Sequence, residues 1–197
     1  KAQKHDKSVN SFSKDVFETL QKEFPKLKFR FRKTISKKEI NEKLNTVDAR
    51  LGLTIFLEKS SISPDGGLIE VKDREGKWRV VLVCEAKHQG KDIENISKGI
   101  LVGKNADQLL MVAGNAIERS HKNINEMRNF MIDEKHFPYV LFLQGSNFLT
   151  ETITVIKPDG TEVILKHDDG VLNRLDRLTA SNYSLPINQN NCENIVI

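Results

Sequence analysis

Cysteine is scarce in this chain of 197 residues, which has Cys84 in an apolar run and Cys192 in a polar stretch. Two cysteines are too few for a disulfide scaffold and match no zinc-binding spacing, so we expect a reducing compartment. Long apolar runs are also absent: none approaches the roughly 18 residues needed to cross a bilayer, and no signal peptide is visible. The sequence therefore predicts a soluble intracellular protein with no membrane partner.

The charges that are present are unevenly distributed. Residues 1–50 carry 14 Lys and Arg against 7 Asp and Glu, whereas the rest of the chain carries 17 against 20. A basic segment of this kind favours a polyanionic partner such as a nucleic acid backbone. A lysine-rich surface that is only solvated would give the same counts, so the charge pattern alone leaves both interpretations open.

The apolar pattern predicts an α/β fold in a single domain over residues 1–197. Apolar side chains make up 38% of the chain, which is enough for a core, and we find no repeat or linker. Ser36 and Glu39 have the spacing of a capping box, so a helix should begin there. Periodicity predicts further helices at 13–24, 106–135 and 170–178, strands at 68–72, 78–85, 138–144, 152–156 and 162–165, and loop after 181. The expected architecture is a mixed central β-sheet with flanking helices.

Three Glu-x-Lys tripeptides occur in the chain, and only their contexts distinguish them. Glu75-Gly76-Lys77 lies at the predicted hairpin turn and should be solvated. A symmetric hairpin places Glu70 opposite Arg79, where an ordinary cross-strand ion pair would explain it. The third tripeptide, Glu85-Ala86-Lys87, follows directly from the most apolar strand, so solvation explains it poorly.

The same hairpin register brings Asp65 close to Glu85. It places Asp65 opposite Cys84, one step from Glu85, and Lys87 shares a strand face with Glu85 at about 7 Å. Two carboxylates at the edge of an apolar core repel each other unless a divalent cation or a shared proton neutralises them. Oxygen ligands suit Mg²⁺ or Mn²⁺, and a nearby lysine can orient a metal-bound water. We therefore expect a metal-dependent phosphodiesterase, with a buried structural ion cluster as the alternative.

Pro64-Asp65 and Glu85-Ala86-Lys87, with nineteen residues between them, resemble the PD-(D/E)-x-K signature of nucleases. From about Ser13 to Cys192 the chain resembles the EcoRI family of type II restriction endonucleases. The resemblance is most detailed at residues 64–67, 85–92, 113–123, 136–143 and 172–180. The resemblance implies the PD-(D/E)-x-K restriction endonuclease fold, with Asp65 and Glu85 as metal ligands and Lys87 as the catalytic lysine. It also implies that the family's extreme N- and C-terminal segments are missing from this chain.

The resemblance further implies a homodimer that cleaves double-stranded DNA in a bacterial cytoplasm. The expected reaction is Mg²⁺-dependent hydrolysis at palindromic GAATTC, cut after the G to leave five-prime overhangs, with Mn²⁺ as a substitute. A cognate DNA methyltransferase would belong to the same system without being a physical partner. Two alternatives are a structure-selective repair nuclease of the same fold and a non-cleaving DNA-binding module whose carboxylates are structural.

Candidate DNA contacts lie in the second half of the chain. Asn115 and Arg119 share a helical face and are the types that pair bidentately with adenine and guanine, although such side chains on an exposed helix are usually only solvated. For Arg174 and Arg177 the simpler account is an internal salt-bridge network. Val112 stands where the family has alanine, so we hypothesise that the central AATT is retained and the outer base pair is relaxed. The DNA-binding residues that the resemblance implies are Lys104, Met111, Val112, Gly114, Asn115, Ala116, Arg119, Arg174 and Arg177.

Overall fold

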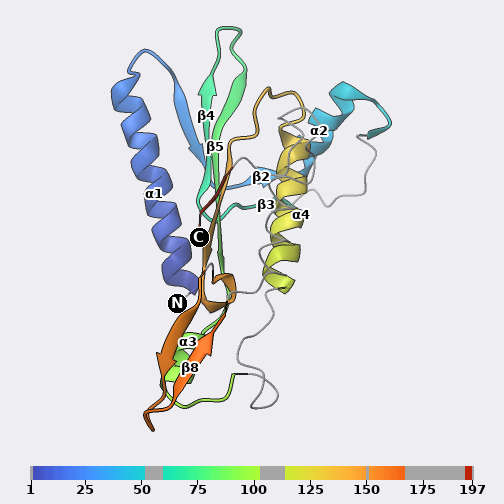
Figure 1. The fold of residues 1–197 in the computed structure, drawn as a ribbon. Coiled ribbons are helices and arrows are strands. Elements are labelled where there is room, and N and C mark those ends of the chain that lie inside the picture. The colour runs from blue at the N-terminus through green and yellow to red at the C-terminus, as the bar shows by residue number, and fades with distance from the viewer. Residues whose placement is uncertain (1, 52–59, 103–113, 150, 167–193, 197) are drawn as a thin grey trace.

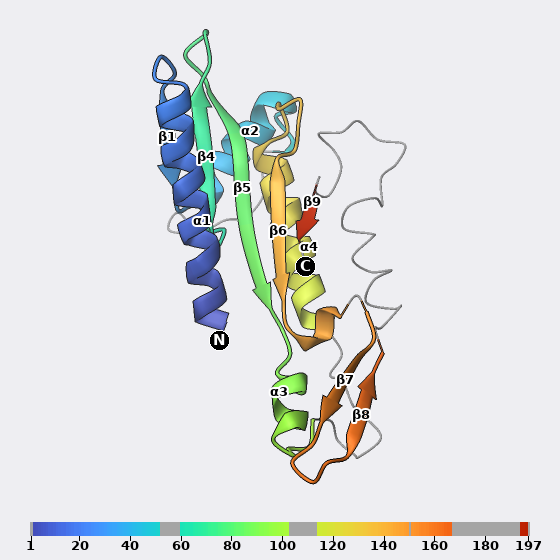
Figure 2. The same cartoon turned by 60° about the vertical axis from the view of Figure 1, so that its left-hand side comes forward.

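A computed structural model describes residues 2–51, 60–102, 114–149, 151–166 and 194–196 (Figure 1). The elements follow one another as α1 Ala2–Glu23, β1 Phe29–Arg32, β2 Ile35–Ser36, α2 Lys37–Val47, β3 Ser61–Ile62, β4 Gly67–Lys72, β5 Trp78–His88, α3 Asp92–Ser97, α4 Gly114–Phe130, β6 Tyr139–Gln144, the 3-10 turn η2 Ser146–Phe148, β7 Ile153–Ile156, β8 Glu162–Leu165 and β9 Asn194–Val196. The small unit of α3, β7 and β8 lies beyond one end of the long strand β5 (Figure 2).

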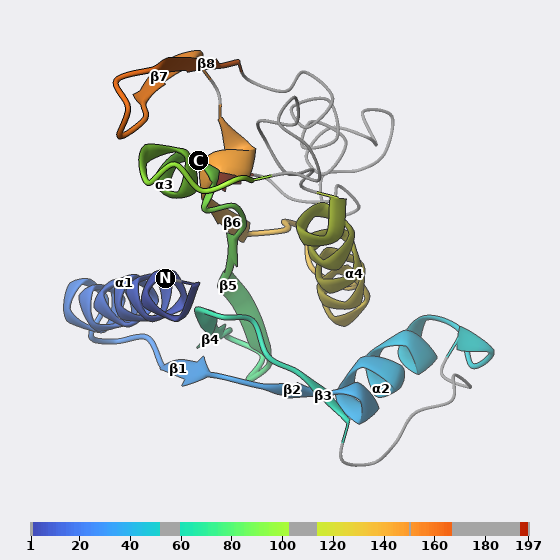
Figure 3. The ribbon, with the colours of Figure 1, turned by 90° about the horizontal axis from the view of Figure 1, so that it is seen from below.

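The central sheet has the strand order β1-β4-β5-β6-β9. Strands β1, β4 and β5 are antiparallel neighbours, whereas β6 runs parallel to β5, and β9 parallel to β6. Helix α1 covers one face of the sheet and α4 lies on the other, as the end view in Figure 3 shows. The structure therefore confirms the predicted mixed sheet with flanking helices.

Successive residues of β5 alternate between two apolar clusters. Val83 packs with Ile124 of α4 in the main core, while Cys84 packs with Val9 of α1 on the opposite face. Both faces of β5 are therefore covered, which explains why the strand is apolar in consecutive positions. The same alternation places Glu85 on the α4 side of the sheet.

The β4–β5 hairpin forms as predicted, but its turn is longer than a symmetric two-residue turn. The amide of Asp73 donates to the carbonyl of Lys77 at 2.8 Å, and Gly76 has φ 83°. A three-residue turn that ends in a left-handed residue has these features. Glu70 consequently lies opposite Val80, and the predicted placement opposite Arg79 is wrong.

Glu70 pairs with arginines of β1 instead. Arg30 is its register partner across β1 and β4, and the distance from Arg30 Nε to Glu70 Oε2 is 2.6 Å. Arg32 Nη1 lies 3.7 Å from the same oxygen. The prediction that Glu70 forms an ion pair is therefore confirmed, but its partners are Arg30 and Arg32 and not Arg79, because β1 was not predicted from the sequence.

The other predicted elements are confirmed where the structure describes them. At the start of α2 the Ser36 hydroxyl accepts a hydrogen bond from the Glu39 amide at 3.2 Å, and the Glu39 carboxylate accepts one from the Ser36 amide at 3.0 Å. Strand β6 and the β7–β8 hairpin also form, and the hairpin packs on α3 through Ile96. Residues 106–113 and the predicted helix at 170–178 lie outside the described residues.

Both terminal segments differ from the predictions. Helix α1 begins at Ala2, not at Ser13, and Val9 anchors the added turns against β5. Beyond residue 181, where we expected loop, Asn194–Val196 adds a strand beside β6. Neither α1 nor any other helix in the described segments is long and apolar enough to cross a membrane.

Candidate active site

A tight turn before β4 brings Asp65 to the end of β5. The Gly67 amide donates to the Pro64 carbonyl at 2.8 Å, and the Gly66 amide donates to the Cys84 carbonyl at 2.9 Å. Gly67 has φ 72°, a left-handed conformation that favours glycine. Because a bulge at Ile69/Glu70 shifts β4 once more, Gly67 lies opposite Cys84, and the predicted pairing of Asp65 with Cys84 is wrong.

The three residues of the signature nevertheless meet. The Asp65 amide donates to Glu85 Oε2 at 3.1 Å, and Asp65 Oδ2 accepts a hydrogen bond from the Ala86 amide at 3.3 Å. Lys87 Nζ lies 3.3 Å from Asp65 Oδ2, contacts Glu85 Oε1 and donates to the Ala86 carbonyl at 2.9 Å. The predicted proximity of two carboxylates and a lysine is therefore confirmed, although the predicted register is not.

Glu85 holds a buried carboxylate. Its side chain is 2% exposed, against 32% for that of Asp65. Burial raises the pKa of Glu85 above its ordinary value; the Lys87 ammonium opposes this rise, and the Asp65 carboxylate adds to it. A negative charge on Glu85 therefore depends on a cation close by.

The ammonium of Lys87 shows where a cation fits. It contacts three oxygens, one each from the Asp65 carboxylate, the Glu85 carboxylate and the Ala86 carbonyl. Oxygen donors with water completing the coordination are what Mg²⁺ and Mn²⁺ take. In the part of the chain that the structure describes, no three His, Cys, Asp or Glu side chains gather to hold a metal. The donor set available here is thus two carboxylates and one carbonyl.

A cavity of about 440 Å³ lies beside these residues. Helix α4 forms part of its wall, and there Arg119 and Lys122 bring positive charge to a cavity that also contains Asp65. Such a combination favours an anionic ligand, for example a phosphate group held with a divalent cation. The residues that line this cavity are Asp6, Asp65, Ala86, Lys87, His88, Arg119, Lys122 and Asn123.

Four of the predicted DNA contacts lie in α4. Gly114, Asn115 and Ala116 form its first turn, and Arg119 lies one turn further on, where its exposed side chain lines the cavity. The other predicted contacts fall outside the described residues; they are Lys104, Met111, Val112, Arg174 and Arg177.

Sequence reasoning did not single out two asparagines that contact the site. Asn123 Nδ2 donates to Glu85 Oε1 at 2.5 Å, and Asn10 Nδ2 lies 3.5 Å from the Asp65 carbonyl oxygen. Asn123 follows Arg119 by four residues, so helical spacing could have indicated it. Asn10 gave no signal, because no element was predicted for the segment that contains it.

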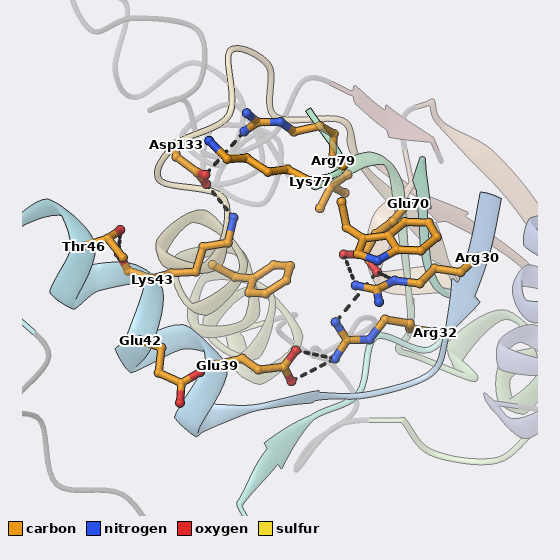
Figure 4. A pocket seen from close by; sticks show the side chains of 14 residues that line it. Arg30, Arg32, Glu39, Glu42, Lys43, Thr46, Glu70, Lys77, Arg79 and Asp133 are labelled. Atoms are coloured by element: carbon orange, nitrogen blue, oxygen red, sulfur yellow. Dashed lines mark hydrogen bonds and ion pairs between the residues drawn. The ribbon is translucent and has the colours of Figure 1, made fainter. Parts of the chain in front are cut away.

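A second cavity, of about 410 Å³, lies between α2 and the turn end of the β4–β5 hairpin (Figure 4). Its charged side chains pair with one another: Arg32 Nη2 lies 2.8 Å from Glu39 Oε1, and Lys43 Nζ lies 2.6 Å from Asp133 Oδ1. We interpret this cavity as part of an ion-pair network that fastens α2 to the rest of the fold. Asp65 and Lys87 of the signature line the other cavity.

The fold and the site together define a class of protein. A mixed sheet with helices on both faces carries Pro64-Asp65 on the turn into one strand and Glu85-Ala86-Lys87 on the neighbouring strand. This is the arrangement of a PD-(D/E)-x-K nuclease.

Comparison with known proteins then identifies the family. A family model described as "Restriction endonuclease EcoRI" matches residues 1–197. The chain is 62% identical over 193 residues to the type II restriction enzyme EcoRI of Escherichia coli. The aligned residues make up 98% of this chain and 70% of that protein. It is 59% identical over 196 residues to the type II restriction enzyme RsrI of Cereibacter sphaeroides. These aligned residues make up 100% of this chain and 71% of that protein. The chain therefore belongs to the EcoRI family of restriction endonucleases, and membership implies a DNA substrate and a divalent metal cofactor.

Proposed function

We propose that this chain is a type II restriction endonuclease that hydrolyses double-stranded DNA at GAATTC with Mg²⁺, or with Mn²⁺ in its place. Cleavage after the G would leave five-prime overhangs. The observation that carries the proposal is the meeting of Asp65, Glu85 and Lys87 beside a cavity that Arg119 and Lys122 also line. A scissile phosphate can bind there between a carboxylate-bound cation and the basic side chains of α4.

Each signature residue has a role that its contacts support. Asp65 and Glu85 would hold the metal ion together with the Ala86 carbonyl, and a bound ion would act as a Lewis acid that shields the phosphate and lowers the pKa of a water. Lys87, which reaches both carboxylates, orients the attacking water and offsets the negative charge that develops on the phosphate.

Base recognition is assigned to the residues that the family resemblance implies, with Asn115 and Arg119 of α4 among them. Their amide and guanidinium groups suit the edges of adenine and guanine. Val112, where the family has alanine, relaxes the outer base pair and leaves the central AATT as the conserved requirement. Cleavage rates on all single-base variants of GAATTC test this assignment, and a central substitution that is tolerated best would refute it.

The proposal includes a homodimer of a single-domain chain over residues 1–197. A palindromic duplex presents two equivalent half-sites and two scissile bonds, which a two-fold dimer matches. The enzyme would act in the cytoplasm of a bacterium whose own GAATTC sites are protected by a cognate DNA methyltransferase. That methyltransferase shares the recognition sequence without binding the nuclease.

A plasmid that carries one GAATTC site tests the proposed activity. With Mg²⁺ the protein should convert the plasmid into a single linear product, and either EDTA or the substitution Asp65→Asn should abolish this product. Asp15→Asn is the matched control, because Asp15 is exposed on α1 and should be dispensable.

The other outcomes of this assay separate the alternatives. A GAATTC-specific band shift in Ca²⁺, with no cutting in Mg²⁺, would favour a DNA-binding module with structural carboxylates. Cutting of branched or damaged DNA, but not of GAATTC, would favour a repair nuclease. A protein that neither cuts GAATTC nor gives a specific band shift would refute the proposed specificity.

A further inference from the structure

Helix α4 reaches the carboxylate of Glu85 through Asn123. The side-chain amide of Asn123 donates to Glu85 Oε1 at 2.5 Å. Two other donors to this carboxylate are the Asp65 amide, 3.1 Å from Oε2, and the Lys87 ammonium, in contact with Oε1. Asp65 belongs to the neighbouring turn and Lys87 to the same strand as Glu85. Asn123 therefore ties Glu85 to a helix on the face of the sheet.

Asn123 lies where α4 passes from a mostly exposed segment to one that packs in the core. Of the residues at 118–122, only Ser120 is buried; directly after Asn123, Ile124 is fully buried, followed by Met127 at 1% exposure. The second half of α4 is thus fixed in the core. The half that begins the helix lies beside the cavity of the candidate active site, which Asn123 itself lines.

The helix that supplies this donor also carries predicted base contacts. Asn115, Arg119 and Asn123 follow one another at intervals of four residues, which keeps their backbone positions within about 80° around the helix axis. The hydrogen bond from Asn123 is short, so a shift of α4 by one residue's rise, about 1.5 Å, is on the scale at which such a bond is lost. The hydrogen bond from Asn123 therefore links the position of α4 to the orientation of Glu85.

The chemistry of this contact suits a positioning role. A carboxylate oxygen has two acceptor sites, so Glu85 Oε1 can accept the Asn123 amide and still face a cation. The amide is neutral, so it orients the buried carboxylate without cancelling the charge that a cation requires. A lysine or arginine at position 123 would compete with that cation for the same oxygens.

We infer that Asn123 is a positioning residue that couples recognition of DNA by α4 to the orientation of Glu85. The inference rests on the proposed function, because it takes Glu85 as a metal ligand and α4 as a DNA-contacting helix. The structure already has the hydrogen bond from Asn123 to Glu85 in place. Cognate DNA bound by the first half of α4 preserves it, so the two carboxylates present their oxygens together. A different sequence would draw this half of the helix aside, so that Glu85 would lose its donor and the metal site would be less well formed.

Calorimetric titration of Ca²⁺ tests the inference without relying on turnover. The probes are CaCl₂ and two short duplexes of equal composition, one with GAATTC and one with these bases scrambled. Wild-type protein should bind Ca²⁺ more tightly in the presence of the cognate duplex. Asn123→Ala should lose most of that difference, with a loss of roughly 10-fold in Ca²⁺ affinity on cognate DNA, as is typical when a partner of a metal ligand is removed.

Two further variants make the result decisive. Asn123→Leu keeps much of the bulk of the side chain but has neither the donor nor a new charge, so it should lose a similar amount of affinity and decides the question if Asn123→Ala does not fold. Asn125→Ala is the matched control: Asn125 Oδ1 accepts a hydrogen bond from Arg128 on the same helix at 2.9 Å, and its loss should leave the duplex difference intact.

Cleavage kinetics give a second readout, because the loss of a merely structural residue would not lower kcat while leaving KM unchanged. Asn123→Ala should lower kcat by about 10- to 100-fold while KM for DNA changes little. Folded Asn123 variants that keep the full difference between the two duplexes would overturn the inference and leave the proposed function standing. Wild-type protein that binds Ca²⁺ equally with both duplexes, or does not cut GAATTC, would overturn the proposed function together with the inference.

Discussion

Gly66 lies directly against Cys84. Its amide donates to the Cys84 carbonyl at 2.9 Å, and a Cβ added to Gly66 would stand 2.5 Å from the Cβ of Cys84. The turn that holds Asp65 is therefore packed on β5 with no space for a side chain, and this close approach sets how far Asp65 stands from Glu85.

Gly66→Ala should push the turn away from β5 and move Asp65 with it. Overpacking of this kind costs about 1–3 kcal/mol of unfolding free energy, and a metal ligand displaced by roughly 1 Å lowers the cleavage rate by about 100-fold. Urea unfolding and plasmid linearisation measure the two effects. Gly160→Ala is the control, since its Cβ would meet nothing within 4 Å while its φ of 82° still costs stability. It should lose stability and keep its cleavage rate; wild-type cleavage by Gly66→Ala would contradict the role of this packing.

Lys87→Ala should lose turnover and keep specific binding. A side chain that takes part in proton transfer contributes about 10²- to 10⁴-fold to the rate, and Lys87 contacts both candidate metal ligands. Single-turnover cleavage in Mg²⁺ and a GAATTC band shift in Ca²⁺ measure the two properties separately. Lys77→Ala is the control from another Glu-x-Lys tripeptide, because Lys77 is exposed and pairs with Glu75 at 3.3 Å. Undiminished turnover in Lys87→Ala would rule out the catalytic assignment.

Glu70→Ala should destabilise the fold without changing the cleavage rate of the folded protein. The Glu70 side chain is 2% exposed, and its loss leaves Arg30 and Arg32 without their shared carboxylate. We expect a loss of about 3 kcal/mol in unfolding free energy, near the lower end for a broken buried pair, because Arg30 is 37% exposed. Urea unfolding tests this against Glu42→Ala, whose exposed pair with Lys38 at 3.9 Å should contribute less than about 0.5 kcal/mol. Similar losses in the two variants would contradict it.

Glu39→Gln should lower stability at neutral pH and have no effect in acid. Burial would raise the pKa of Glu39, but hydrogen bonds from Ser36 and Arg32 outweigh it and hold the pKa below its ordinary value of 4.5. A carboxyl group with a lowered pKa stabilises the fold at pH values above its unfolded pKa, and this contribution disappears as the pH falls through the folded pKa. Glutamine preserves the capping box, so the variant isolates the charge.

The size of this pH effect should be modest. The Glu39 side chain is 38% exposed, so screening by water limits the difference at pH 7 to about 0.5 kcal/mol. Thermal unfolding of both proteins from pH 7 down to pH 3 measures it. A difference that stays constant over this range would mean that the charge of Glu39 does not contribute.

Local patterns predicted the parts of the fold that depend on neighbouring residues. The capping box of Ser36 and Glu39 and the apolar strand before Glu85 are both visible in short stretches of sequence. Glu85 and Lys87 needed only the two-residue period of a strand to share a face. The proximity of Asp65 survived an error in register, because the turn at Pro64–Gly67 brings the carboxylate back to β5.

Contacts between distant segments could not be predicted in the same way. The alternation of apolar and charged residues at 27–32 is a strand signal that was not used, and it does not reveal that β1 pairs with β4, so Glu70 was matched to Arg79 rather than to Arg30. The donor Asn123 contacts Glu85 across 38 residues of sequence, from a helix whose packing on the sheet depends on the whole core. Strand β9 pairs through β6 alone among the strands of the described segments, so its own three residues give no pattern to detect.

Strand β5 extends beyond the end of its antiparallel neighbour β4, and the candidate active site lies beside this unpaired part of β5. The β4–β5 ladder ends at Gly67 and Cys84, whereas pairing of β5 with β6 continues to His88. Two residues further on, the same register would pair Asp65 with Ala86; instead, the Ala86 amide donates to the Asp65 carboxylate and the Ala86 carbonyl accepts from the Lys87 ammonium. If β4 paired regularly with β5 for two more residues, the amide and carbonyl of Ala86 would form ordinary backbone hydrogen bonds within the sheet. The Ala86 carbonyl and the Asp65 carboxylate would then no longer be available to bind a cation. We therefore expect the length of β4 to affect cleavage: a one-residue insertion at Pro64–Gly67, before β4, should lower the cleavage rate far more than one in the β4–β5 turn at 73–77.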